Sequence, residues 1–108
     1  MDGLDDLTLE FSAQIFLWTT DKTAWHFIRL PEEEADLVRF FCQARYEHKR
    51  SRGFQAIKVE VSINETKWQT SIFPDKAHHS FILPLKKSVR DAQGLEANQQ
   101  VRLTMRLL

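Results

Sequence analysis

The sequence has little of what most functional signatures are built from. It contains one cysteine, Cys42, and three glycines in 108 residues. A lone cysteine has no partner within the chain, which excludes a disulfide scaffold and favours a reducing compartment, so we expect the cytoplasm. No glycine-rich phosphate loop, G-x-S-x-G elbow or H-E-x-x-H pattern occurs. We therefore expect no catalytic residue and no cofactor, and we interpret Ser71 as a serine in a polar strand position.

Net charge and long apolar runs are missing as well. Fifteen Lys and Arg residues balance fifteen Asp and Glu residues, so no overall field attracts nucleic acid or an anionic membrane. No apolar run is long enough to span a bilayer, and the first residues, M-D-G-L-D-D, lack the features of a signal peptide. A hydrophobic content of 43 % predicts instead one ordered domain over residues 1–108, as a monomer or small homo-oligomer.

What is present is a strong alternation of apolar and polar residues, which predicts strands. The first runs over residues 7–18, with the odd positions from Leu9 to Leu17 facing inward, and its hairpin partner over 24–30. A second hairpin is predicted at 56–73, and single strands at 80–85 and 100–107. Pro84 cannot donate to a ladder and is expected at a strand end or edge. Trp25 and Trp68 are expected in the core, with stacking on a ligand as the alternative.

Two stretches have helical signals. Pro31, followed by three glutamates, predicts a helix over 32–45, because proline and acidic residues are favoured in a first turn. Gly94 is placed to end a short helix over 86–93. The inward stripe of the first helix is expected to hold Leu37, Val38, Phe41 and Ala44. The pattern predicts a mainly β fold, a small six-stranded Greek-key barrel with two short capping helices.

Three motifs carry a family resemblance: W-x-T-S-I-F-P from Trp68, F-I-L-P-L-K-K-S-V-R from Phe81, and G-L at Gly94. With them the chain resembles, over nearly its whole length, a bacterial family known as Domain of Unknown Function nineteen-oh-five. The resemblance implies a double-split β-barrel, an architecture shared with swapped-hairpin transcription regulators and antitoxins. It implies no activity. The chain departs from the family where Lys76 to His79 replace a loop that commonly contains glycines.

The basic end of the second motif is the candidate binding site. Lys86, Lys87 and Arg90 gather at the start of a predicted helix, whose free N–H groups also favour anions, and strand hydroxyls are expected nearby. The candidate ligand-binding residues are Trp68, Thr70, Ser71, Lys86, Lys87 and Arg90. They indicate a non-catalytic binding or accessory module for a small anionic ligand or a protein partner. A plain charged surface is the alternative.

A second basic group supports a different hypothesis. Arg45, Lys49, Arg50 and Arg52 could contact phosphates, and the fold analogy suggests a nucleic-acid-binding regulator. The zero net charge speaks against it, and a solvated helix end explains the same residues.

The histidines offer a metal hypothesis that the spacing does not favour. His78 and His79 are adjacent, with His26 or His48 as a third ligand. Neighbouring residues in an extended chain point to opposite sides, and no structural-zinc spacing occurs, so we expect no metal.

Overall fold

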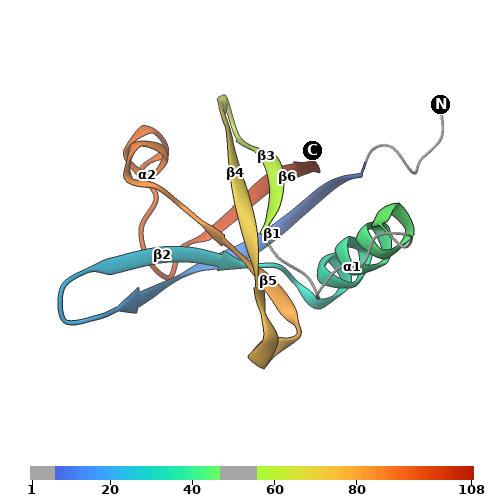
Figure 1. The fold of residues 1–108 in the computed structure, drawn as a ribbon. Coiled ribbons are helices and arrows are strands. Elements are labelled where there is room, and N and C mark those ends of the chain that lie inside the picture. Colours follow the sequence, from blue (N-terminus) through green and yellow to red (C-terminus); the bar gives the residue numbers. More distant parts are fainter. Residues whose placement is uncertain (1–6, 47–55) are drawn as a thin grey trace.

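The computed structural model describes residues 7–46 and 56–108 (Figure 1). The strands in this part are β1 (Thr8–Thr19), β2 (Ala24–Arg29), β3 (Ile57–Ile63), β4 (Thr66–Asp75), β5 (Ser80–Pro84) and β6 (Gln100–Leu107). The helices are α1 (Glu32–Tyr46), the short 3-10 helix η2 (Lys76–His78) and α2 (Lys87–Gln93). The strands and α-helices predicted from the sequence are all confirmed, with ends that differ by one or two residues.

The strands form a closed barrel in the order β1-β2-β5-β4-β3-β6, with every pair antiparallel. The predicted small β-barrel is therefore confirmed; its double-split form stays a prediction. In Figure 1 the two α-helices lie on opposite sides of the barrel, with α2 beside the β3–β4 side and α1 near the end of β5. Closure gives each strand of the barrel a neighbour on either side, although β4 and β5 pair only between Phe73–Asp75 and Ser80–Ile82.

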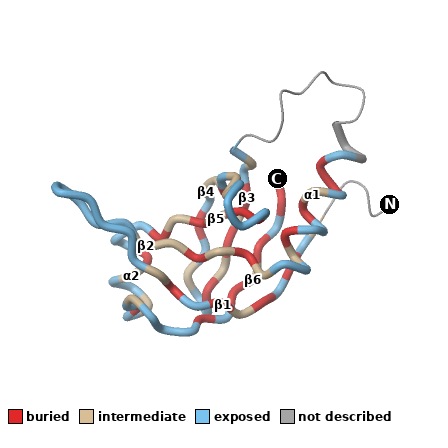
Figure 2. The backbone as a smooth tube through the Cα atoms, turned by 90° about the horizontal axis from the view of Figure 1, so that it is seen from below, coloured by how far each residue is buried: buried red, intermediate tan, exposed pale blue. Residues whose placement is uncertain are grey.

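The interior is filled by the alternate residues of each strand (Figure 2). Ile15, Ile28 and Met105 are completely buried, and Trp68, 8 % exposed, belongs to the same core as predicted. Cys42 is buried beside this core on α1, which agrees with its interpretation as a small hydrophobe. Burial of alternate side chains on every strand is the hydrophobic driving force for closing the sheet.

Three expected core residues are exposed instead. Leu17, Trp25 and Leu37 have 46 %, 47 % and 44 % of their surface exposed. Leu17 pairs with His26 near the tip of the β1–β2 hairpin. This hairpin extends beyond the barrel in Figure 1. Trp25 and Ile28 are three residues apart in β2, so their side chains are on opposite faces of the strand. Because Ile28 points inward, Trp25 lies on the outer face. Leu37 lies outside the stripe that α1 buries.

Pro84 ends the ladder between β4 and β5. The paired positions stop at Phe73 and Ile82, and the same register continued would place Ser71 opposite Pro84. Leu85 donates its N–H to a β2 carbonyl 2.9 Å away, so alternation along the strand directs Pro84 toward β4. Proline has no N–H, so it cannot donate the hydrogen bond that would continue this ladder. The prediction that Pro84 stands at a strand end is confirmed.

The burial of the core residues predicts how substitutions change the free energy of unfolding. Leu83 is completely buried, and Leu83→Ala should lower the free energy of unfolding by about 2–5 kcal/mol through lost apolar burial and the cavity left behind. The exposed Leu37→Ala should stay within about 0.5 kcal/mol of the wild type. Urea unfolding of both variants tests this, and equal losses would contradict the assignment of the core.

Candidate functional site

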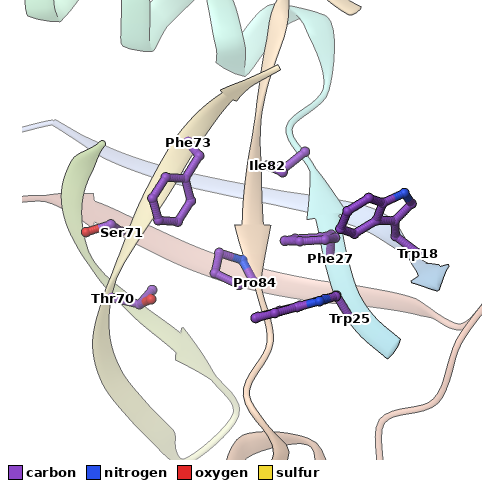
Figure 3. A pocket seen from close by; sticks show the side chains of 8 residues that line it. All are labelled: Trp18, Trp25, Phe27, Thr70, Ser71, Phe73, Ile82 and Pro84. Carbon is purple, nitrogen blue, oxygen red and sulfur yellow. The ribbon is translucent and has the colours of Figure 1, made fainter. Parts of the chain in front are cut away.

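A groove of about 570 Å³ lies open on the outside of the barrel, across β1, β2, β5 and β4 (Figure 3). Its volume is in the range of sites that hold small ligands or peptide side chains. The lining residues are Trp18, Trp25, Phe27, Thr70, Ser71, Phe73, Ile82 and Pro84.

The β1–β2 hairpin provides an aromatic wall. The strand register sets Trp18 opposite Trp25 and Phe16 opposite Phe27, all on the outer face. The rings of Trp25 and Phe27 are stacked, with centroids 6.3 Å apart and planes at 12°. Trp18 is 55 % exposed and Trp25 47 %. Large exposed aromatic residues gathered in one patch are uncommon on soluble proteins and mark interaction sites.

β4 provides the opposite wall, and β5 lies between the two. In Figure 3, Phe73, Ser71 and Thr70 project from β4, and Ile82 and Pro84 from β5. The groove opens where the β4–β5 ladder ends at Pro84. The local sequence therefore shapes the site, since a proline stands at the ladder position next to the two hydroxyls.

Within residues 7–46 and 56–108, no ionisable side chain lines the groove. Its polar side-chain groups are the indole N–H groups of Trp18 and Trp25 and the hydroxyls of Thr70 and Ser71. None of these four groups has a hydrogen-bond partner among the residues that the structure describes. The lining is thus mainly apolar and uncharged; its indole N–H groups can donate, and its hydroxyls can donate or accept.

Charged residues stand just beyond one end of the groove. Arg29, paired with Ile82 in the sheet, donates from Nε to Asp75 Oδ2 at 2.8 Å, and its guanidinium lies 4.7 Å from the centre of the Phe16 ring. His78 Nδ1 is 3.0 Å from the same carboxylate oxygen. Burial raises the pKa of Asp75, but the hydrogen bonds from Arg29 and His78 outweigh it and leave this pKa below its ordinary value of 3.8.

The structure separates the six residues that the sequence grouped as a ligand site. Thr70 and Ser71 line the groove, whereas Trp68 is part of the core.

The basic residues among the six lie on or beside α2, outside the groove. Lys87 Nζ pairs with Asp91 at 2.8 Å, and Arg90 Nε donates to the Leu85 carbonyl at 3.1 Å. Lys86 is exposed at the residue before α2. Two of the three cations therefore already have partners close by in the sequence.

The residues of the nucleic-acid hypothesis and of the metal hypothesis lie only partly within the described structure. Arg45 belongs to α1, and Lys49, Arg50 and Arg52 lie outside the described residues, as does His48. In residues 7–46 and 56–108, no group of three His, Cys, Asp or Glu side chains is arranged to hold a metal ion. His78 contacts Asp75, and His79 is exposed beside it with a left-handed backbone.

Sequence reasoning missed most of the groove. Trp18, Phe27, Phe73, Ile82 and Pro84 were not among its candidates, although each lines the site. A usable signal was present, because the strand at residues 24–30 has apolar side chains on both faces. A strand in a small barrel buries only one face, so its second apolar face had to be exposed or covered by a partner.

His26 and Arg90 form a second unusual pair, at the inner side of the barrel end. His26 Nδ1 is buried without a hydrogen-bond partner in the described part of the chain. Burial, and then the nearby positive charge of Arg90, lower the pKa of His26 below its ordinary value of 6.5. Both effects favour the neutral form of the imidazole.

Fold and groove together define the class: a small closed β-barrel with an uncharged aromatic site on its outer face. The chain belongs to the family described as Domain of unknown function (DUF1905), whose model matches residues 11–105. This match confirms the resemblance drawn from the sequence motifs. No curated protein matches the chain at a significant level. In the described ranges no helix is long and apolar enough to cross a membrane.

The Asp75 site predicts a pH-dependent contribution to stability. Because the folded-state pKa of Asp75 is lowered, its contribution is present above pH 3.8 and is lost as the pH falls through the folded-state value. Arg29→Met should therefore destabilise the protein near neutral pH, by no more than about 1 kcal/mol since Arg29 is partly exposed. Urea unfolding at a series of acidic pH values should show that the difference in free energy of unfolding between the wild type and Arg29→Met becomes smaller as the pH falls. A difference that stays constant with pH would contradict the ion pair's role, and Arg102→Met, which removes an exposed pair with Glu10, is the control.

The His26 site makes a separate prediction. A lowered folded-state pKa means that the contribution of His26 to stability is present above pH 6.5 and is lost as the pH falls through the folded-state value. An NMR titration should place the pKa of His26 below 6.5. Arg90→Gln should raise this pKa, because it removes a positive charge that disfavours protonation of the imidazole. Lys87→Gln, on the same helix, should leave it unchanged. An unaltered pKa in Arg90→Gln would refute the proposed electrostatic contact.

Proposed function

We propose that this chain is a non-catalytic binding module for a protein partner, and that the outer groove is its contact surface. The observation that carries the proposal is the exposed aromatic wall. Trp18 and Trp25 remain about half exposed although the same strands bury their other face efficiently. Tryptophan and other aromatic residues dominate the binding energy of protein interfaces, because they bury much apolar area with few rotatable bonds.

A protein partner suits the groove better than a small anion. A small anion is bound most strongly by cationic side chains, and the described lining includes no charged side chain. The anion alternative would depend on Lys86, Lys87 and Arg90, of which Lys87 and Arg90 have local partners. Nucleic acid is disfavoured for the same reason, since phosphate contacts by Lys and Arg supply most of its affinity.

The chemistry of the lining supports a binding role over catalysis. Ser71 is a hydroxyl in the groove, but the described lining includes no His, Asp, Glu, Lys or Cys to act as its base. The hydroxyls of Ser71 and Thr70 are therefore assigned to hydrogen bonding with the partner. We place the protein in the cytoplasm on the grounds of its single cysteine.

Peptide selection tests the proposal although the partner is unidentified. Phage-displayed random peptides selected on the intact protein should bind the groove, and Phe73→Ser should lower their affinity at least about tenfold by removing part of one wall. Phe40→Ser, which alters a phenylalanine on α1 with 68 % exposure, is the matched control and should bind as the wild type does. Circular dichroism verifies that both variants are folded.

Two outcomes would defeat the proposal. The first is a selection from a diverse library that yields no enriched peptide. The second is a set of enriched peptides that bind the wild type and Phe73→Ser equally well. Retention of phosphate-bearing probes that depends on Lys86 and Lys87 would instead favour the anion alternative.

A further inference from the structure

One edge of the sheet is left open beside the groove. We infer that an extended segment of the partner adds to this edge as a strand and pairs with β4 between Lys67 and Ser71. This inference rests on the proposed function and adds the conformation and chemistry of the bound segment. The segment is a single extended chain, held by main-chain hydrogen bonds, with apolar side chains directed toward the aromatic wall.

The first part of β4 has a strand partner on one side only. β3 pairs with β4 from Thr66 to Ile72, whereas β5 pairs with it only from Phe73 onward. After Pro84 the chain leaves the β4 ladder, because Leu85 donates to a β2 carbonyl and α2 follows. A strand with one neighbour presents unpaired N–H and C=O groups on its other side. Another strand can therefore pair with β4 along this edge.

The direction of the unpaired backbone groups follows from the observed ladders. Leu85 donates to β2, so Ile82, three positions earlier, directs its N–H and C=O toward β4, where it pairs with Phe73. These directions alternate along a strand, so Gln69 and Lys67 point their groups to the same side as Phe73 does. Among the described residues, no strand, turn or side chain provides partners for them there. Both residues are exposed, so a ligand can reach these groups.

The groove includes this edge. Thr70 and Ser71 are consecutive in β4, so their side chains point to opposite faces of the strand. Both nevertheless line the groove, which therefore extends around the edge of β4. A strand added here would place alternate side chains between Trp25 of β2 and Phe73 of β4 (Figure 3). Apolar residues suit these positions, because aromatic side chains pair favourably with aromatic and β-branched neighbours.

The open edge selects a strand over a helix. Its outward backbone groups recur at every second residue of β4, and the main chain of an extended segment presents matching groups at the same spacing. An α-helix uses its N–H and C=O groups internally. A helix that covered the edge would bury the backbone groups of Lys67 and Gln69 without partners, which is costly.

The far wall of the groove favours a single segment over a second copy of this chain. The groove is bounded on that side by Pro84 of β5 and by Trp25 and Phe27 of β2. A second copy could offer its own β4 edge, but that strand has β3 beside it, about 4.8 Å away. The β3 strand of the second copy would meet the wall formed by β2. An isolated extended segment brings no such neighbour.

Amide hydrogen exchange tests the inference at the edge itself. The probe is the most enriched peptide of the phage selection, synthesised with acetylated and amidated ends. The amides of Lys67 and Gln69 should exchange rapidly in the free protein, and saturating peptide should slow them at least about tenfold, because they donate to peptide carbonyls. The amides of Trp68 and Thr70, which point to β3, should be protected with and without peptide.

Two substitutions at one position separate the backbone donor from the side chain. Gln69→Pro removes an N–H that points away from β3, so the β3–β4 ladder keeps its hydrogen bonds. It should weaken peptide binding about tenfold, because a peptide carbonyl loses its donor. Gln69→Ala keeps the N–H and should bind as the wild type does. Circular dichroism verifies folding, and the exchange experiment uses the wild type, so it remains decisive if Gln69→Pro does not fold.

Methylation of the peptide's backbone nitrogens distinguishes the bound conformations. In an added strand, successive residues direct their N–H groups alternately toward β4 and away from it. Methylation at every second position should therefore abolish binding, and methylation at the positions between should leave the affinity unchanged. A helical ligand would lose binding at consecutive positions, because its N–H groups form internal bonds. That pattern would refute the added strand.

The outcomes distinguish this inference from the function on which it rests. If enriched peptides bind the groove but leave exchange at Lys67 and Gln69 unchanged, the added strand is refuted and the binding module stands. If the free protein sediments as a dimer in which both amides are already protected, a second copy occupies the edge and the inference fails. If no peptide binds the groove, the inference and the proposed function fail together. Equal binding by the wild type and Gln69→Pro would refute main-chain pairing at this edge.

Discussion

The outer surface of this barrel is shaped by one backbone N–H donor that is missing, at Pro84. Pro84 faces β4 at the position where the β4–β5 ladder would continue, and it has no N–H to give. The ladder ends there, and the groove opens beside Ser71 and Thr70. The closed barrel tolerates this interruption because β4 remains paired with β3 along most of its length, and β5 remains paired with β2. The interruption leaves the β4 edge from Thr66 to Ile72 without a strand partner on the β5 side, and the groove lies beside part of this edge.

The β1–β2 hairpin serves two purposes with its two faces. Its inner face contributes Ile15 and Ile28 to the core, and its outer face holds the aromatic wall. Keeping Trp18 and Trp25 exposed gives up apolar burial that the fold would otherwise use, at about 25 cal/mol per Å². Residues that forgo this stabilisation are expected where a partner covers them.

The charges of the molecule are arranged locally and leave the groove neutral. Arg29 is engaged by Asp75 and by the Phe16 ring, and Lys87 by Asp91. Under the proposed function, recognition at the groove would therefore depend on shape, aromatic contact and hydrogen bonding. Such binding is expected to depend weakly on salt, because the described lining contributes no charged side chain to it.

Local pattern determined the elements of this protein, and contacts between distant residues decided its site. Alternation specifies the strands at residues 57–63 and 100–107, and Pro31 with the glutamates after it specifies the start of α1, because period and capping are properties of neighbouring residues. The family resemblance around Trp68 likewise implied the barrel, and two of the candidate ligand-binding residues, Thr70 and Ser71, line the groove.

The exposed faces of the strands and the composition of the groove depended on the register between strands far apart in the sequence. Nothing in the order of residues shows that Trp25 faces outward or that Ser71 stands at the level of Pro84. A shift of one residue in pairing would exchange the two faces of a strand, and only the packing of the complete barrel excludes it. Sequence therefore determined which strands exist, and tertiary structure decided which of their faces is buried and which lines the groove.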